Sequence, residues 1–414
     1  MKLCSDFSMT KPLVSRNVRT IVFSPAWLVG LFVVCLGCSP SAAPHLQGEL
    51  IFPPQEKHVH ASSIVECPNG DLLACWFWGS GERTASDVLI QGARLKKGSS
   101  TWSPIFLMAD TPEIPDCNPV LFIDKQEQLW LFWIAVPADR WEDSLLRYRT
   151  ATDYQGDGPL KWDWQDLIIL KPGDEFLKAT EDGFKTMPPP PGYGDNAAKE
   201  QNRVIEMAKD ISLRQRGWMT RTPLVVLPSG RILLPLYSDG YLFGMMAISD
   251  DQGKTWRAGS PIVGLGLNQP TVLRKKDGTL LAYMRDEGPP PKRALLSVSK
   301  DDGETWSTAV DLDMLNPNSS LVGIVLDDGR WVMAYNDTEE GRHSLVLAMS
   351  DDEGETWKWE RHLELQDEGA FHYPFMIQTR DGLIHLSYTH QPGEQADKSI
   401  KHVELNADWI IEGD

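Results

Sequence analysis

The chain is poor in cysteine and has no long apolar run beyond its first 38 residues. Six cysteines occur in 414 residues, and only Cys67, Cys75 and Cys117 lie beyond residue 38. Three cysteines make no disulfide framework, so we expect them to be buried as small apolar side chains. No later segment is long and apolar enough to span a bilayer as a helix. The composition, 42% apolar and 24% charged, excludes long disordered or collagen-like stretches.

Positive charge is also scarce. The chain has 40 Lys and Arg residues against 58 Asp and Glu residues, which gives a formal net charge of −18. A chain this acidic repels phosphate backbones, so we expect no nucleic-acid partner. An anionic ligand could bind only through local arginines whose field outweighs that of the whole chain.

Residues 1–38 have the pattern of an export signal. Four basic residues precede residue 20, an apolar run extends from Ile21 to Gly37, and a polar stretch follows Cys38. The segment resembles a bacterial lipoprotein signal, which implies lipidation of Cys38 and a periplasmic or cell-surface location. Plain secretion and an uncleaved membrane helix are the alternatives. A lipid at Cys38 is therefore the membrane attachment that we expect, and residues 39–49 are interpreted as a short linker.

A repeated motif predicts the fold. The pattern S-x-D-x-G-x-T-W occurs at residues 249–256, 299–306 and 350–357, and a period near 50 residues is typical of propellers and repeat arrays. An apolar strand precedes each copy, and a hairpin with a glycine turn precedes that strand. Six such hairpins have their turns near residues 70, 125–126, 230, 278, 329 and 382. We therefore predict one all-β domain, a six-bladed β-propeller over residues 50–410, whose last blade is completed by residues 47–55.

The motif itself is interpreted as structural. Its Asp and Ser side chains can hydrogen-bond the backbone of a tight turn, its Gly supplies positive φ, and its Trp can pack between blades. The turns that carry Asp251, Asp301 and Asp352 are expected on one face of the propeller.

One stretch interrupts the period, and we interpret residues 172–216 as a loop and helix insertion. Prolines occupy positions 188–191, and residues 195–216 place Val204, Ala208 and Ile211 on one helical face after a possible cap at Asp195 or Asn196. Insertions on a repeat usually decorate one face of the array.

The face opposite the motif turns is the expected functional site. In a propeller, the first strand of each blade starts at one rim and the second strand returns to that rim. The second strands end at residues such as Tyr237 to Asp239 and Arg285 to Glu287. Polar side chains with several donors and acceptors can bind the hydroxyls of a sugar, and flat aromatic rings can pack against its apolar face. The residues expected around one central cleft are His60, Glu82, Asp87, Asn118, Arg221, Gln269, Arg285, Asn318, Arg342, His372, Tyr373 and Tyr388.

The repeats and the mouth motifs resemble the sialidase (neuraminidase) superfamily and, within it, the BNR-repeat-like branch of bacterial proteins. The resemblance covers about residues 56–410. The strings that carry it are His60-Ala-Ser-Ser-Ile-Val, Pro68-Asn-Gly-Asp-Leu-Leu-Ala, Gly79-Ser-Gly-Glu82-Arg, Ser86-Asp87-Val, Asn118-Pro-Val-Leu-Phe, Asn316-Pro-Asn-Ser and Tyr373-Pro.

This resemblance implies site roles. Sialidases bind the substrate carboxylate with three arginines, attack with a tyrosine that a glutamate activates, and use an aspartate as acid and base. Arg285 and Arg342 match the second and third arginines, and Tyr373 matches the nucleophile. His60 stands where the first arginine is expected and Gln269 where the glutamate is expected. Asp87 or Glu82 would be the acid and base, and the other cleft residues would bind substrate.

Three functions follow as alternatives. The first is an exo-acting glycoside hydrolase that removes terminal acidic sugars, such as sialic acid or a uronate, from a glycan or polysaccharide. The second is a lyase or unusual hydrolase for uronate-containing polysaccharide, with His60 at its centre because an unperturbed imidazole titrates near neutrality. The third is a propeller that binds glycans without catalysis. We expect no cofactor and no metal, since His58 and His60 have no third ligand at a suitable spacing.

Overall fold

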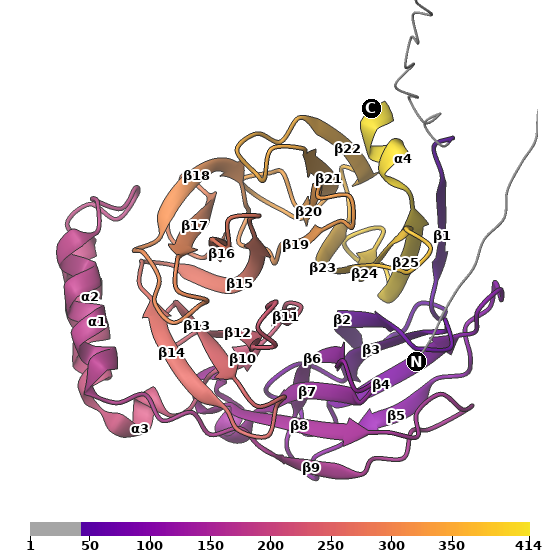
Figure 1. The fold of residues 1–414 in the computed structure, drawn as a ribbon, viewed down its shortest axis with the longest axis horizontal. Helices are drawn as coiled ribbons and strands as arrows, with labels where there is room; N and C mark the ends of the chain where they lie inside the picture. Colours follow the sequence, from indigo (N-terminus) through magenta and orange to yellow (C-terminus); the bar gives the residue numbers. More distant parts are fainter. Residues whose placement is uncertain (1–42) are drawn as a thin grey trace, which may run out of the picture. The chain divides into compact units, whose positions relative to one another are not determined.

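The computed structural model describes residues 43–414. The predicted export signal and Cys38 lie outside the described residues. Six antiparallel sheets form a ring (Figure 1), which confirms the six-bladed propeller. Over residues 43–414, no helix is both long and apolar enough to cross a membrane.

Blades 1 to 3 follow one another along the chain, and the first strand of blade 3 is broken into two short pieces. Their strands are β2 (His58–Glu66), β3 (Leu72–Gly79), β4 (Leu89–Leu95) and β5 (Phe106–Ala109) in blade 1; β6 (Asp116–Ile123), β7 (Leu129–Ala135), β8 (Leu145–Ala151) and β9 (Trp164–Leu167) in blade 2; and β10 (Met219–Thr220), β11 (Val225–Val226), β12 (Ile232–Ser238), β13 (Phe243–Ser249) and β14 (Arg257–Ile262) in blade 3.

Blades 4 to 6 complete the ring. Their strands are β15 (Leu267–Arg274), β16 (Leu280–Asp286), β17 (Arg293–Ser299) and β18 (Val310–Leu315) in blade 4; β19 (Val322–Val325), β20 (Trp331–Tyr335), β21 (Ser344–Ser350) and β22 (Trp359–Leu365) in blade 5; and β23 (Ala370–Gln378), β24 (Ile384–Gln391), β25 (Ser399–Leu405) and the N-terminal β1 (Leu46–Leu50) in blade 6.

Strand β1 closes the ring. It pairs antiparallel with β25 from Leu46 opposite Leu405 to Leu50 opposite Lys401, so the two ends of the domain share one sheet. This pairing covers the edge of β25 and gives blade 6 its fourth strand. The blade begins at Leu46, within the segment interpreted as a linker. Helix α4 (Ala407–Glu412) then ends the chain, and its cap Asn406 accepts a hydrogen bond from the backbone N–H of Trp409 at 3.0 Å.

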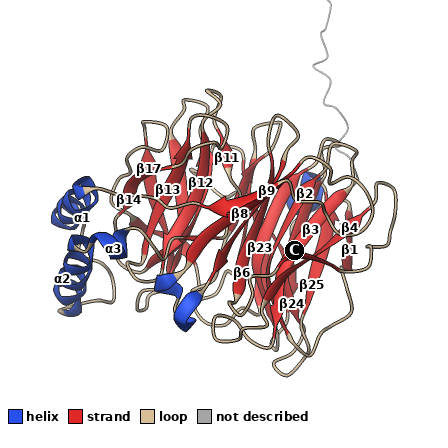
Figure 2. Cartoon of the chain, turned by 90° about the horizontal axis from the view of Figure 1, so that it is seen from below, coloured by secondary structure: helices blue, strands red, loops and turns tan. Residues whose placement is uncertain are grey.

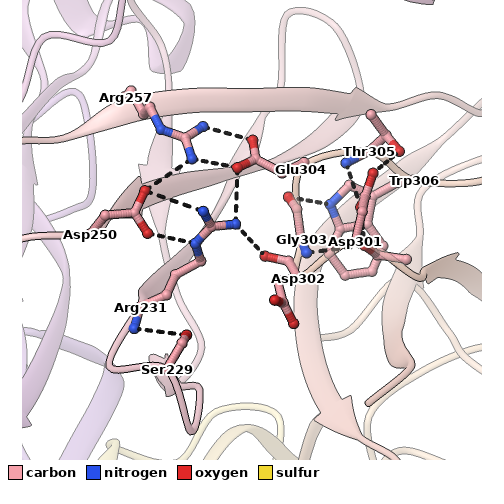
Figure 3. A network of polar contacts seen from close by, with 11 residues as sticks. Ser229, Arg231, Asp250, Arg257, Asp301, Asp302, Gly303, Glu304, Thr305 and Trp306 are labelled. Carbon is pink, nitrogen blue, oxygen red and sulfur yellow. Dashed lines mark hydrogen bonds and ion pairs between the residues drawn. The ribbon is translucent and has the colours of Figure 1, made fainter. Parts of the chain in front are cut away.

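The repeated motif forms the same turn each time. The Asp301 carboxylate accepts hydrogen bonds from the Thr305 backbone N–H at 3.0 Å, the Thr305 hydroxyl at 2.5 Å and the Ser299 hydroxyl at 2.8 Å (Figure 3). Asp251 and Asp352 make the equivalent bonds.

The motif tryptophans reach the preceding blade. The Trp256 ring meets Phe132 edge-on at 5.8 Å, and the Trp357 ring meets Tyr283 at 6.1 Å. The structural interpretation of the motif is therefore confirmed.

Strand pairing separates the two faces. Ser238 is opposite Phe243 at one end of the β12–β13 hairpin, whereas Ile232 is opposite Ser249, the first residue of the motif, at the other end. The motif turns therefore lie on the rim opposite the ends of the second strands. Cys67, Cys75 and Cys117 are buried and free, as predicted.

The insertion contains more helix than predicted. Helices α1 (Asp174–Thr186), α2 (Asn196–Lys209) and α3 (Ile211–Arg214) lie beside blade 3, outside β14 (Figures 1 and 2). Helix α1 was not predicted, although its buried Phe176, Thr180 and Phe184 have helical spacing. Val204 and Ala208 are buried as expected, but Ile211 is 58% exposed because a new helix begins there. The other helical turns are the short Pro137–Asp139 and Trp141–Asp143.

Candidate functional site

A repeated backbone distortion shapes the mouth of the propeller. In five blades, one residue near the start of the first strand has a left-handed φ between 51° and 60°; these residues are Ala61, Asn118, Gln269, Asn318 and Tyr373. In four of these blades the pairing with the second strand shifts register at the same point. Each such residue costs about 1–3 kcal/mol, and distortions of this kind concentrate at functional sites. Four of the five are predicted site residues.

Tyr373 is the centre of the cluster. Its hydroxyl oxygen accepts hydrogen bonds from Arg285 Nη1 at 2.7 Å and from Gln269 Nε2 at 3.2 Å. The His60 ring lies 4.0 Å from the Tyr373 ring, measured between centroids. Both donors stabilise negative charge on the phenolic oxygen, which an attacking tyrosine must develop. Gln269 cannot accept a proton, so it does not replace the basic glutamate of the resemblance.

Two arginines flank this tyrosine. Arg285 Nε donates to Asn318 Oδ1, and Arg342 Nη2 donates to the Asn318 carbonyl at 2.6 Å. The Arg342 guanidinium lies 5.5 Å from the Tyr373 ring centroid, and its Nη1 is 3.3 Å from His372 Nδ1. Asn318 therefore aligns both arginines, and two guanidinium groups beside one tyrosine form a local positive region in an acidic protein.

The two site histidines are neutral. Burial, followed by the repulsion that a protonated His372 would exert, lowers the pKa of His60 well below its usual range. Burial, followed by the charge of Arg342, lowers the pKa of His372 in the same way. His60 Nδ1 is 2.9 Å from the Thr389 hydroxyl, which helps to fix the ring. His60 can therefore exchange hydrogen bonds with a substrate, but it adds no positive charge near neutral pH.

Arg221 holds the backbone beneath Tyr373. It is 1% exposed, and it donates hydrogen bonds to the carbonyls of Ser62 at 3.0 Å, Tyr373 at 2.5 Å and Pro374 at 2.9 Å. Burial lowers its pKa to about 10, so it remains charged at neutral pH. Arg221 was predicted to bind substrate, but these contacts with the main chain make it a positioning residue.

Asn118 joins the cluster indirectly. Its Nδ2 donates to the Tyr237 hydroxyl at 2.9 Å, and Tyr237 also shares a hydrogen bond with Gln269. Burial, followed by the charge of Asp239, raises the pKa of Tyr237 well above its usual range, so its hydroxyl stays protonated. Tyr237 therefore connects blades 2, 3 and 4 in the mouth.

Two carboxylates lie beside the arginines. Asn268 Nδ2 donates to Glu287 at 2.7 Å and to Asp239 at 3.2 Å, and Arg285 Nη2 lies 3.4 Å from Glu287. The sequence predicted that these two segments reach the mouth but did not single out either carboxylate. The sequence signal that could have identified them is their position at the ends of the second strands of two neighbouring blades.

Three predicted site residues lie apart from Tyr373. Glu82 is paired with His58 at 3.1 Å; burial raises its pKa, but the His58 hydrogen bond and the nearby positive charges together outweigh this, and the pKa is lowered. Asp87 binds Lys57 at 2.7 Å and the Ser80 hydroxyl at 2.6 Å, and these bonds lower its pKa. The Tyr388 hydroxyl donates to Glu364 at 2.7 Å.

The surroundings of these three residues explain the difference. Glu82 borders the cluster through His58, whose ring is 5.5 Å from that of His60. Asp87 fastens a loop, and an acid with a lowered pKa is a weak proton donor near neutral pH. Tyr388 points between blades 5 and 6, whereas its neighbour Thr389 reaches the mouth and contacts His60. The alternation of side chains along β24 decides between these neighbours.

The repeat is also found by comparison with known proteins. The model of the BNR repeat-like domain matches residues 70–219 and 216–386. The chain belongs to the BNR repeat-like domain family. One relative is a sialidase of Micromonospora viridifaciens, 27% identical over 172 residues. That match covers 39% of this chain and 25% of the sialidase, so the chain matches only a quarter of that protein's length.

Solved structures agree on the fold of this BNR repeat-like protein. A protein of unknown function from Dyadobacter fermentans superposes with a TM-score of 0.63 at 16% identity, over 87% of this chain and 99% of that one. The NanB sialidase of Streptococcus pneumoniae gives a TM-score of 0.64 at 13% identity, over 87% of this chain and 71% of that one. At these identities the likeness establishes the propeller architecture alone.

Proposed function

We propose that this protein is an exo-acting glycoside hydrolase that removes terminal acidic sugars from glycans. The observation that carries the proposal is the convergence of Arg285 and Arg342 on Tyr373, with Arg285 Nη1 only 2.7 Å from the tyrosine oxygen. The family membership and the sialidase relative support the same class of substrate. Sialic acid and uronate-linked residues are the candidates, since both carry a carboxylate.

The arginines would hold the carboxylate of the sugar. A guanidinium presents a planar fork of N–H donors that matches a carboxylate, and such pairs are stronger where water is partly excluded. The side chain of Arg285 is 12% exposed, so a bound carboxylate would be shielded from solvent there. His60, neutral and 4.0 Å from the Tyr373 ring, would add a hydrogen bond where a third arginine is absent.

Tyr373 would act at the anomeric carbon, as nucleophile or as electrostatic stabiliser of the positively charged transition state. Tyrosine nucleophiles are an established exception to the two-carboxylate scheme of glycosidases. Arg285 and Gln269 would stabilise the phenolic oxygen as its charge develops.

Product analysis on a panel of acidic glycans tests this proposal. A hydrolase releases a free reducing sugar, a lyase leaves an unsaturated uronate that absorbs in the ultraviolet, and a binding protein releases nothing. Release of the saturated acidic sugar by the wild type, lost in Tyr373→Phe, is the expected result. An unsaturated product, or equal release by both proteins, would refute it.

We also propose that the chain is exported and processed near Cys38, on the basis of residues 1–38. Mass spectrometry of the mature protein should show an N-terminus at or near Cys38, with or without a lipid. A mature protein that retains Met1 would contradict export with cleavage.

A further inference from the structure

The carboxylate pair of Asp239 and Glu287 has no role in the scheme above. The two side chains come from neighbouring blades and meet at a single donor atom, Asn268 Nδ2, which is 3.2 Å from Asp239 and 2.7 Å from Glu287. Asn268 is fully buried, and its Oδ1 has no hydrogen-bond partner among residues 43–414. An amide with one buried, unpaired acceptor beside two carboxylates needs a donor from a ligand or from a protonated acid.

The pair lies next to the reactive tyrosine. Arg285 bridges the two, since its Nη1 contacts the Tyr373 oxygen at 2.7 Å and its Nη2 is 3.4 Å from Glu287. Both carboxylates are partly exposed, unlike the fully buried Asn268 below them. A sugar whose carboxylate is bound by Arg285 would therefore bring its glycosidic oxygen near this pair.

The groups around Asp239 favour its protonated form. Burial, followed by the charge of Glu287, raises the pKa of Asp239 to about 7; Glu142 acts in the same direction, whereas Arg285 and the Asn268 hydrogen bond oppose it. Tyr237 also faces Asp239 and stays protonated. Two carboxylates this close hold one proton more readily than none.

The insertion braces the loops that carry the pair. Arg203 of α2 donates to the Gly240 carbonyl at 2.9 Å, directly after Asp239, and the Tyr241 hydroxyl donates to the Met207 carbonyl at 3.2 Å. On the other side, a Cβ on Gly288 would lie 3.1 Å from the Tyr193 hydroxyl, so the insertion also packs against the residue after Glu287. Both carboxylates are thus held by packed structure instead of free loops.

We infer that Asp239, paired with Glu287, is the general acid and base of this site, in place of Asp87 or Glu82. The inference rests on the proposed hydrolase function. In the first step the Asp239 carboxyl gives its proton to the leaving glycosidic oxygen, the bond from that oxygen to the anomeric carbon breaks, and the Tyr373 oxygen bonds to that carbon while its own proton passes to water. In the second step Asp239 takes a proton from a water whose oxygen bonds to the anomeric carbon, the tyrosine–sugar bond breaks, and Tyr373 is reprotonated from solvent.

A comparison of leaving groups tests the role of Asp239. The probes are 3′-sialyllactose, whose sugar leaving group needs a proton, and the 4-methylumbelliferyl glycoside of the same acid, whose phenol does not; a glucuronyl disaccharide and 4-methylumbelliferyl glucuronide form the uronate pair. Asp239→Asn should lower kcat/KM by about 100-fold or more on the sugar-linked probe and by less than about 10-fold on the aryl probe. Equal losses, or no loss, on the two probes would overturn the inference.

Two further variants complete this experiment. Glu287→Gln removes the charge that raises the Asp239 pKa, so the basic limb of the pH profile should move to lower pH; an unmoved limb counts against the pair. It carries the test alone if Asp239→Asn does not fold. Asp157→Asn, at a carboxylate that is 76% exposed, is the matched control, and its kcat/KM should equal that of the wild type on both probes.

A measurement without substrate separates this inference from the proposed function. Folded Asp239 binds its proton up to about pH 7, whereas the unfolded chain loses it near pH 4, so wild-type stability declines as pH rises through this window. The melting temperature of Asp239→Asn relative to wild type should therefore increase from pH 5 to pH 8. A difference that does not change with pH refutes the proton-holding pair. If this difference appears but the wild type releases no sugar, the hydrolase proposal fails and the catalytic role of Asp239 fails with it, while the proton-holding pair stands.

Discussion

The two faces of the propeller differ in where their polar side chains find hydrogen-bond partners. On the motif face, Asp251, Asp301 and Asp352 make nearly identical hydrogen bonds to a Ser, a Thr and a backbone N–H within their own eight residues. On the mouth face, the left-handed position near the start of the first strand is Asn118, Gln269, Asn318 or Tyr373 in four of the blades. The side-chain partners of these residues come from other blades.

This difference separates a face whose hydrogen bonds stabilise the fold from a face that carries the candidate functional site. In a motif turn the Ser, Asp and Thr side chains bond one another and the local backbone, so the turn can be repeated without regard to its neighbours. The mouth keeps buried arginines and, among residues 43–414, amide oxygens without a hydrogen-bond partner such as Gln269 Oε1, each of which costs stability. The blades offset these costs together, through the interfaces that the motif tryptophans help to fill.

Removal of the tyrosine hydroxyl should have the largest effect. Tyr373→Phe should lower kcat by at least about 10³-fold and change KM little, because the hydroxyl acts mainly in the transition state. The melting temperature should stay close to that of the wild type. Steady-state kinetics with the probes above measures the effect, and a variant that keeps most of its kcat would remove Tyr373 from the chemistry.

Loss of an arginine should come next. Arg285→Ala should weaken substrate binding by roughly 2–5 kcal/mol, because the carboxylate would lose a shielded charge partner. Arg285→Lys keeps the charge but not the fork, so it should recover only part of the affinity. Calorimetric titration with the product sugar measures both variants, and equal affinity for Arg285→Ala and wild type would place the carboxylate elsewhere.

A motif variant should affect stability alone. Asp301→Ala removes three hydrogen bonds of one turn, and we expect the free energy of unfolding to fall by roughly 1–3 kcal/mol. The kcat of the folded fraction should not change. If Asp301→Ala, properly folded, lost as much kcat as Tyr373→Phe, the division of labour between the two faces would be wrong.

The smallest effect is expected from the ion pairs that join blades 3 and 4. Arg257 binds Glu304 at 2.5 Å and Asp250 at 3.1 Å, and Arg231 joins the same network (Figure 3). The Arg257 side chain is 45% exposed, so Arg257→Ala should cost at most about 1 kcal/mol. This cost should shrink at high salt. Thermal melts at low and high ionic strength measure it, and a large, salt-independent loss would show that the network does more than join two surfaces.

Much of the architecture could be predicted from local signals. Glycine turns and alternating strands predicted six hairpins, and the motif spacing predicted equal blades, because both depend on contacts within a few residues. Helix α1 was missed since its buried positions Phe176, Thr180 and Phe184 stand among charged residues before a proline run. Arg221 was assigned to the substrate because the sequence shows a charge near the rim but not the carbonyls that surround it.

The sequence by itself determined the repeat, the ring closure and the rim on which the polar residues gather, since these follow from hairpin order and side-chain alternation. Tertiary structure alone decided which of these residues meet. Gln269 and Arg285 reach Tyr373 across 104 and 88 residues of chain, and only ring closure together with the register shifts in β15 and β23 sets those contacts. The neutral state of His60 and the raised pKa of Asp239 were likewise decided there, because both depend on burial and on charges from other blades.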